Sequence, residues 1–182
     1  MPRIRLPWRR VRLPVPLVAA LDPDEQIQVS ASVVTGETLA ASRFGLWVCS
    51  TDSASRWNWE RISKASLSGR TLTVIPAEEV GRTESGIVLL ADLAAVPFQL
   101  VGTNGLTDAV HARVRRSVAA SRHLAWPGAG GWVVLRRIPG SDGLTTQVRL
   151  DRGAEPNAGG FLPAAAEAAE ELLAELSGSH GG

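Results

Sequence analysis

Residues 26–101 alternate between apolar and polar positions in a series of short segments. Ile27, Val29 and Ala31 are separated by polar side chains, which is the period-two pattern of a half-buried strand. Further strands, divided by glycines and polar turns, are predicted at residues 38–42, 46–49, 57–63, 70–75, 87–90 and 98–101. Pro76 is expected to end one strand, with a charged loop at 78–85 after it. The pattern predicts a largely antiparallel barrel or sandwich.

The period changes after residue 105, where an apolar stripe follows helical spacing. The stripe consists of Leu106, Val110, Val114, Ser117, Val118 and Ser121. We therefore expect one helix over 106–122 that covers an end or an open seam of the barrel. Arg113 and Arg116 fall on one flank of this stripe.

The last third of the chain predicts a β-hairpin and a second helix. Residues 132–138 and 144–150 resemble strands joined by a segment rich in Pro and Gly, and 164–176 has high helix propensity with Pro163 in its first turn. Four prolines among residues 1–20 predict an irregular start. The expected fold class is α+β. Its parts are a basic Pro/Arg-rich arm at 1–21, a strand-rich core with its capping helix at 22–122, a hairpin plus acidic helix at 123–177 that packs on this core within the same domain, and a disordered tail at 178–182.

This order of elements resembles the pleckstrin-homology-like (PH-like) fold, in which seven short strands precede a helix. The similarity is carried by residues 39–49 and by Trp57-Asn58-Trp59-Glu60-Arg61-Ile62, where bacterial members of this class often have an aromatic-rich strand. The chain over 20–176 also resembles a group of small actinobacterial proteins of unknown function. The resemblance implies a PH-like barrel that serves as a binding module or scaffold. The first hairpin, residues 33–38, has no basic residue, so the resemblance does not extend to binding of lipid headgroups.

The net charge of +1 conceals an asymmetry between the two ends of the chain. The first twelve residues carry five arginines and no acid, whereas the end of the chain after Arg152 carries five glutamates and no Lys or Arg. Pro14 and Pro16 interrupt the only short apolar run near the start, and no run reaches the length of a membrane helix. We expect a cytoplasmic protein.

The residues that usually carry catalysis or metal binding are few. Cys49 is the single cysteine and lies in an apolar segment typical of a buried thiol, and the three histidines show no zinc spacing. Neither a GxGxxG nor a GxxxxGK[ST] phosphate loop is present. The sequence therefore predicts no enzyme activity, no metal and no cofactor.

Two interpretations of the function remain open. In the first, the protein is a non-catalytic module or assembly adaptor that binds a protein or peptide through Trp57, Trp59, Arg113 and Arg116. The two tryptophans share one strand face, and the alternative is that they fill the core. In the second, the arm binds an anionic membrane surface or a nucleic acid through Arg3, Arg5, Trp8, Arg9, Arg10 and Arg12. The alternative for the arm is that it packs on the acidic helix or only favours solubility.

Overall fold

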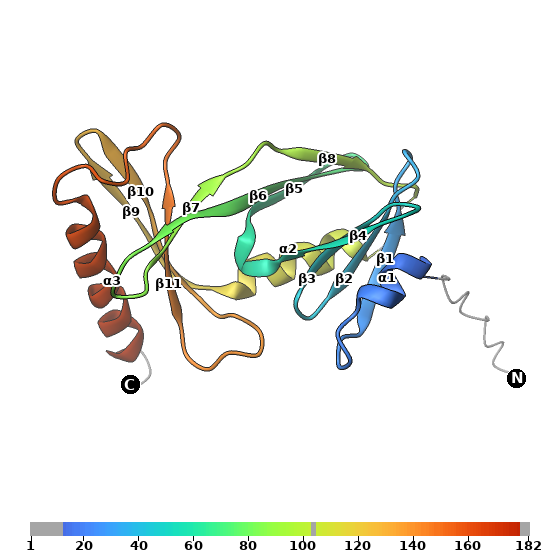
Figure 1. The fold of residues 1–182 in the computed structure, drawn as a ribbon, viewed down its shortest axis with the longest axis horizontal. Coiled ribbons are helices and arrows are strands. Elements are labelled where there is room, and N and C mark those ends of the chain that lie inside the picture. Colours follow the sequence, from blue (N-terminus) through green and yellow to red (C-terminus); the bar gives the residue numbers. More distant parts are fainter. Residues whose placement is uncertain (1–12, 103–104, 179–182) are drawn as a thin grey trace, which may run out of the picture.

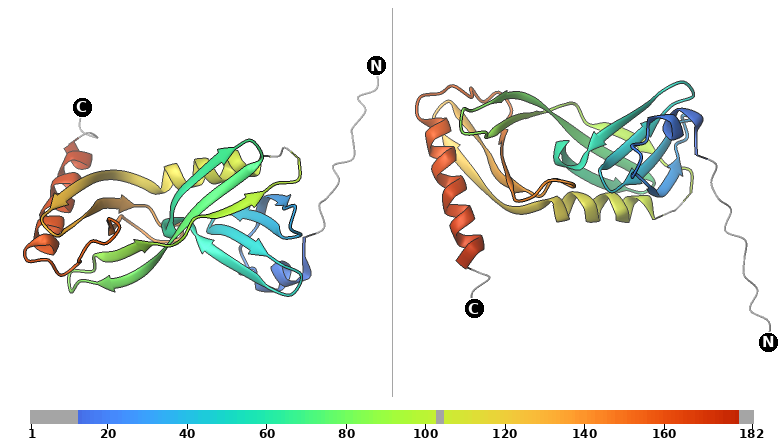
Figure 2. Two further views of the ribbon diagram at one scale, coloured as in Figure 1. Left: turned by 90° about the horizontal axis from the view of Figure 1, so that it is seen from above. Right: turned by 60° about the horizontal axis from the view of Figure 1, so that its bottom comes forward.

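The computed structural model describes residues 13–102 and 105–178, which form two lobes along the long axis of the molecule (Figure 1). The first lobe contains α1, β1–β6, β8 and α2. The second lobe contains β7, β9–β11 and α3, together with the end of β6. Figure 2 shows the chain passing between the lobes along β6 and from α2 into β9. The segment from β7 to β8 also joins the two lobes. The predicted α+β class is confirmed. No helix in the described part of the chain is long and apolar enough to cross a membrane.

The first lobe is built from two antiparallel sheets. The first sheet has the order β1 (Ile27–Ser32), β2 (Thr38–Ser42), β3 (Gly45–Cys49) and β4 (Ala54–Asn58). The short 3-10 helix η1 (Trp59–Arg61) leads into β5 (Ile62–Ser68), which pairs with β6 (Thr71–Arg82), and β6 pairs in turn with β8 (Val96–Gln99). The Val34 N–H donates to the Gln99 carbonyl and the Val101 N–H to the Ser32 carbonyl, each at 2.8 Å, so the ends of β1 and β8 close one side. The predicted antiparallel arrangement is confirmed here.

The helix α2 (Leu106–Ser117) packs against β5, η1, β1 and β2. Leu106 and Val110 are fully buried in the core of the first lobe, and Val114 packs half-buried against it. This confirms the predicted apolar stripe as far as residue 117. The predicted end at residue 122 is wrong, because β9 (Val118–Trp126) begins where α2 ends. The residues of β9 pair with β10, which satisfies their backbone hydrogen bonds and buries part of their side chains beneath α3. The helical spacing of apolar residues within 106–122 does not reveal this distant partner.

Two expectations about β6 are also wrong. Pro76 does not end the strand, and residues 78–82 of the predicted charged loop continue it as far as Arg82. The register of the β5–β6 pair shifts near Pro76, and the Pro76 carbonyl accepts a hydrogen bond from the Leu93 N–H at 2.8 Å. Proline is tolerated at such an irregularity because the pairing of the two strands does not require a backbone N–H donor there. The extended β6 can therefore reach the second lobe.

The predicted irregular start is wrong for the residues that the structure describes. Val15–Ala20 form the helix α1, with Pro14 at its N-cap and Pro16 in its first turn, positions where a missing N–H costs nothing. Leu17 is fully buried against Ala40, Trp47 and Cys49, on the outer face of the first sheet. Residues 1–12 of the arm lie outside the described residues. Of the predicted tail, Gly178 belongs to α3, and 179–182 are also outside the description.

The second lobe is a curled sheet with a helix on one face. Its strands follow the order β6, β7 (Val88–Asp92), β11 (Thr145–Leu150), β10 (Ala129–Arg136) and β9, and β7 runs parallel to β11. The predicted hairpin is confirmed as β10 and β11. Phe161, Ala165 and Leu172 of α3 (Phe161–Gly178) pack on Val133, Leu135 and Val148.

The opposite face of this sheet carries two buried arginines that contact the first lobe. Arg136 of β10 donates from Nη1 to the Ser117 hydroxyl, and from Nη2 to the Ile62 carbonyl at 3.3 Å. Arg149 of β11 donates from Nη2 to the Glu60 carbonyl at 2.8 Å. Loss of hydration lowers the pKa of Arg136 to about 9 and that of Arg149 to about 10. We call this pair of side chains the guanidinium joint.

Replacing Arg136 with alanine should destabilise the protein strongly, because the Trp59 and Ile62 carbonyls and the Ser117 hydroxyl would lose a buried donor. We expect the free energy of unfolding to fall by about 2–4 kcal/mol, measured by urea denaturation. Arg137→Ala is the matched control, since the neighbouring side chain is exposed and should change stability by less than about 0.5 kcal/mol. Equal effects of the two substitutions would contradict the proposed joint.

The thiol of Cys49 should be protected in the folded protein. Its side chain is 1% exposed beneath α1, and burial raises the pKa of the thiol, which further reduces the reactive thiolate. Cys49 is the single cysteine of the chain, so a colorimetric thiol reagent reports on this position alone. We expect labelling only after denaturant is added. Equally fast labelling of the native protein would show that α1 does not cover this face.

Candidate functional site

The two predicted aromatic residues lie against the core of the first lobe. Trp59 is 1% exposed, and its Nε1 donates to the Ser42 carbonyl at 3.1 Å. Trp57 is half-buried, with its ring centroid 5.9 Å from that of Phe98. Trp57 also lines an open hollow of about 600 Å³ beside Pro76 and Val96. Trp59 is therefore part of the core, whereas Trp57 packs on Phe98 and leaves one side toward this hollow.

Arg113 and Arg116 instead meet other arginines at a small hollow between the lobes. The hollow has a volume of about 270 Å³ and is lined by four guanidinium-bearing residues: Arg43, Arg113, Arg116 and Arg137. Trp59 and Ser117 contribute to the same lining. We call this hollow the arginine pocket. It brings together three of the four predicted partner-binding residues, Trp59, Arg113 and Arg116, whereas Trp57 lines another surface.

Three separate elements supply the four arginines. Arg113 and Arg116 are three residues apart in the last turns of α2, so they project on one side of the helix. Arg137 directly follows β10, and its backbone N–H donates to the Ser117 carbonyl at 2.8 Å, which fixes it at the end of α2. Arg43 lies in the turn between β2 and β3. The pocket thus forms only when the two lobes are in place.

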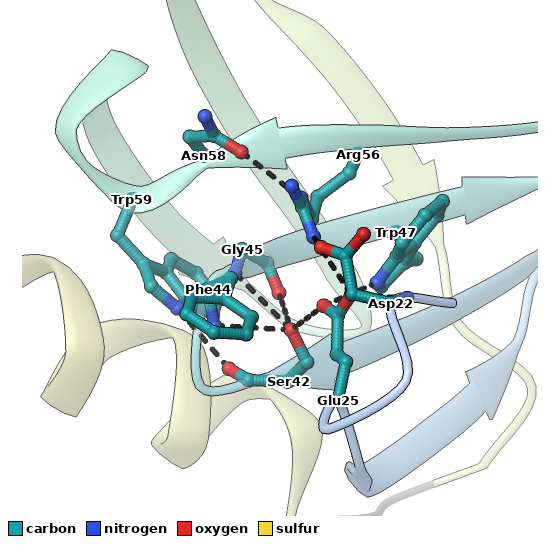
Figure 3. Close-up of polar contacts among 9 residues, drawn as sticks. All are labelled: Asp22, Glu25, Ser42, Phe44, Gly45, Trp47, Arg56, Asn58 and Trp59. Atoms are coloured by element: carbon teal, nitrogen blue, oxygen red, sulfur yellow. Dashed lines mark hydrogen bonds and ion pairs between the residues drawn. The ribbon is translucent and has the colours of Figure 1, made fainter. Parts of the chain in front are cut away.

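A buried polar cluster holds the turn that carries Arg43 (Figure 3). The Ser42 hydroxyl accepts hydrogen bonds from the backbone N–H groups of Phe44 and Gly45, at 3.1 and 3.2 Å. The same hydroxyl donates to the buried Glu25 carboxylate, which also accepts from Trp47 Nε1 at 2.9 Å. Any side chain at position 45 would collide with the Trp57 carbonyl, because a Cβ there would lie 2.5 Å from it. This cluster makes the turn a firm support for Arg43.

The arginine pocket concentrates positive charge that is not neutralised. Within residues 13–102 and 105–178, none of its four arginines forms an ion pair and no carboxylate lines the pocket. Arg113 donates to the Gln28 side chain at 2.8 Å, and the Arg43 guanidinium lies 4.4 Å from the centre of the Phe44 ring. Elsewhere, Arg122 pairs with Glu171 and Glu175 of α3. The pocket therefore offers N–H donors to an external anion.

An apolar hollow adjoins the arginine pocket. It has a volume of about 480 Å³ and is lined by Leu144, Leu173 and Leu176, and Arg137 belongs to the lining of both hollows. We call it the leucine hollow. A ligand that lies across Arg137 can place an acidic group in the arginine pocket and an aliphatic group in the leucine hollow.

The chemistry available in the arginine pocket is binding. Guanidinium groups are strong donors that match carboxylate and phosphate oxygens in pairs, and they do not release protons near neutral pH. Among the described residues, the lining has no histidine, cysteine or carboxylate that could act as a general base or nucleophile. No metal-binding cluster of His, Cys, Asp and Glu exists in the described part of the chain.

Sequence analysis missed two members of the pocket, Arg43 and Arg137. Arg43 lies in the three-residue gap between the strands predicted at 38–42 and 46–49, and Arg137 lies near the end of the strand predicted at 132–138. Each therefore looked like an ordinary exposed charge. Their distance from Arg113 in the chain leaves no local signal. The arm residues Arg3, Arg5, Trp8, Arg9, Arg10 and Arg12 lie outside the described residues.

Comparison with known proteins gives no further guide to this site. No protein-family model matches the chain, and no curated protein has a similar sequence.

Proposed function

We propose that this protein is a non-catalytic PH-like module that binds an acidic segment of a partner protein. The observation that carries the proposal is the convergence of four unpaired guanidinium groups, from three elements, on one hollow without carboxylates. Clusters of arginines recognise carboxylate and phosphate groups through paired, charge-assisted hydrogen bonds. The protein would then act as a reader or adaptor for an anionic motif.

The PH-like part of the proposal is supported by the order of elements in the first lobe. Four strands form one sheet, β5, β6 and β8 form the second, and α2 follows them and packs over the core. Seven strands of this lobe therefore precede its helix, as in the resemblance, with β7 of the second lobe inserted between β6 and β8 in the chain. The first hairpin, at 33–38, carries no basic residue, and this argues against a lipid headgroup at that position.

The leucine hollow favours a peptide over a free inorganic anion. An anion alone would use the arginine pocket and leave the neighbouring leucines without a role. A peptide with an acidic side chain next to an aliphatic one would use both hollows across Arg137. Buried apolar anchors surrounded by polar contacts are typical of protein recognition sites.

The double variant Arg113→Gln/Arg116→Gln should weaken binding of a blocked peptide that carries several glutamates around one leucine. We expect a rise in Kd of roughly tenfold or more, since two charge-assisted donors are lost, measured by fluorescence anisotropy at fixed salt. Arg115→Gln is the matched control: it removes one charge from the same helix but does not line the pocket, so it should have a small effect.

Deletion of residues 1–12 distinguishes the arm hypothesis from the pocket. Peptide binding that survives the deletion and falls in the double variant supports the pocket. If peptide binding is lost in the deletion variant and unchanged in the Arg113→Gln/Arg116→Gln variant, the arm is the binding site and the proposal is contradicted.

Leu173→Ser should separate the two halves of the binding surface. The side chain is 39% exposed, so the substitution should leave the fold intact. We expect the Kd of the leucine-containing peptide to rise about three- to tenfold because apolar burial is lost, while a matched peptide with serine in place of leucine is unaffected. If both peptides respond equally, the leucine hollow does not take part in binding.

A further inference from the structure

A larger hollow lies on the other side of the guanidinium joint, away from the arginine pocket. Its volume is about 780 Å³, and it is bounded by the ends of β7 and β11, by the loop at 93–95 and by β10. The residues that give it chemical character are Ser63, Asp92, Trp132, Arg149, Asp151 and Arg152. We call it the tryptophan hollow. It shares no residue with the arginine pocket.

Arg149 contributes a buried cation to the wall of this hollow. The residue is 7% exposed, and its Nη2 donates to the Glu60 carbonyl. Its Nη1 lies 3.7 Å from Asp92, which is too far for a hydrogen bond, and neither Nη1 nor Nε has a hydrogen-bond partner in the described part of the chain. Both atoms are covered by their surroundings, so Arg149 offers the hollow a positive charge and not an open hydrogen-bond donor.

Trp132 provides an aromatic wall next to this cation. Trp132 of β10 pairs directly with Arg149 of β11, so the two side chains stand on the same face of the sheet. The indole is 47% exposed, which is unusual for so large an apolar side chain. His123 packs against its edge with ring centroids 5.3 Å apart, and this contact orients the ring.

The two carboxylates of the hollow already have partners. Asp92 accepts from the Ser63 hydroxyl at 3.1 Å and faces Arg149, while Asp151 lies 2.8 Å from His123 Nε2. Gly130 makes room for Asp151, since a Cβ there would lie 2.7 Å from Oδ2. Arg152, by contrast, forms no ion pair with any described residue. Arg152 is thus the exposed charged group of the hollow without a carboxylate partner among the described residues, and it favours an acceptor that carries negative charge.

We propose that the tryptophan hollow binds a small aromatic carboxylate. The aromatic ring stacks on Trp132, and the carboxylate accepts hydrogen bonds from the exposed Arg152, near the positive charge of the buried Arg149. A flat aromatic ring binds the indole of Trp132 more favourably than an aliphatic ring does, because it can stack on it. This site is independent of the arginine pocket and of the function proposed for it.

The test uses 2-naphthoate as the probe and the full-length protein, with binding measured by isothermal titration calorimetry. We expect saturable binding with a Kd below about 1 mM. The neutral amide of the probe and the non-aromatic cyclohexanecarboxylate should each bind at least about tenfold more weakly, since each lacks one of the two recognised groups.

Variants of the exposed residues identify the site. Trp132→Ala and Arg152→Gln should each raise the Kd of 2-naphthoate by about five- to tenfold, with melting temperatures near that of the wild type. Arg70→Gln, an exposed arginine outside the hollow, is the control and should leave the Kd unchanged. The absence of saturable binding, equal affinity for the amide, or full affinity in Trp132→Ala would each overturn the proposal.

Discussion

The guanidinium joint is the interaction on which the arrangement of the two lobes depends. Arg136 and Arg149 extend from the sheet of the second lobe toward η1, the start of β5 and the end of α2. There they donate to the Trp59, Glu60 and Ile62 carbonyls and to the Ser117 hydroxyl. Burial of the two cations costs hydration free energy, and this cost is reflected in the lowered pKa values of Arg136 and Arg149. Hydrogen bonds to three backbone carbonyls and to Ser117, together with the nearby charges of Glu60 and Asp92, offset it.

Both candidate sites lie beside this joint. Arg136 points inward, while the next residue, Arg137, stands at the surface and links the arginine pocket to the leucine hollow. Arg149 also belongs to the wall of the tryptophan hollow, to which it contributes a buried positive charge. A change in the joint would therefore move the walls of both sites, which is why the tests rely on exposed residues such as Arg116, Leu173 and Trp132.

Much of the candidate site was within reach of the sequence, and the missing part has a clear cause. The helical stripe placed Arg113 and Arg116 together, because residues three apart share a side of a helix. The sequence could not place Arg43 beside this pair. Arg43 lies 70 residues before Arg113, in the turn between β2 and β3, and this turn comes close to the end of α2 only after both sheets form. The same holds for Arg136 and Arg149, which look like surface charges in a hairpin but face the first lobe.

The sequence by itself determined many local elements of this protein: most of its strands, the buried face of α2, the β10–β11 hairpin, and the scarcity of residues suited to catalysis. These features depend on neighbours in the chain, and hydrophobic periodicity reports them directly. The tertiary structure decided where α2 ends and how β6 continues past Pro76. It also decided that η1 divides the strand predicted at 57–63, and that residues 15–20 of the predicted irregular start form a helix over Cys49. In each case a distant partner supplied the burial or the hydrogen bonds that outweighed local preference.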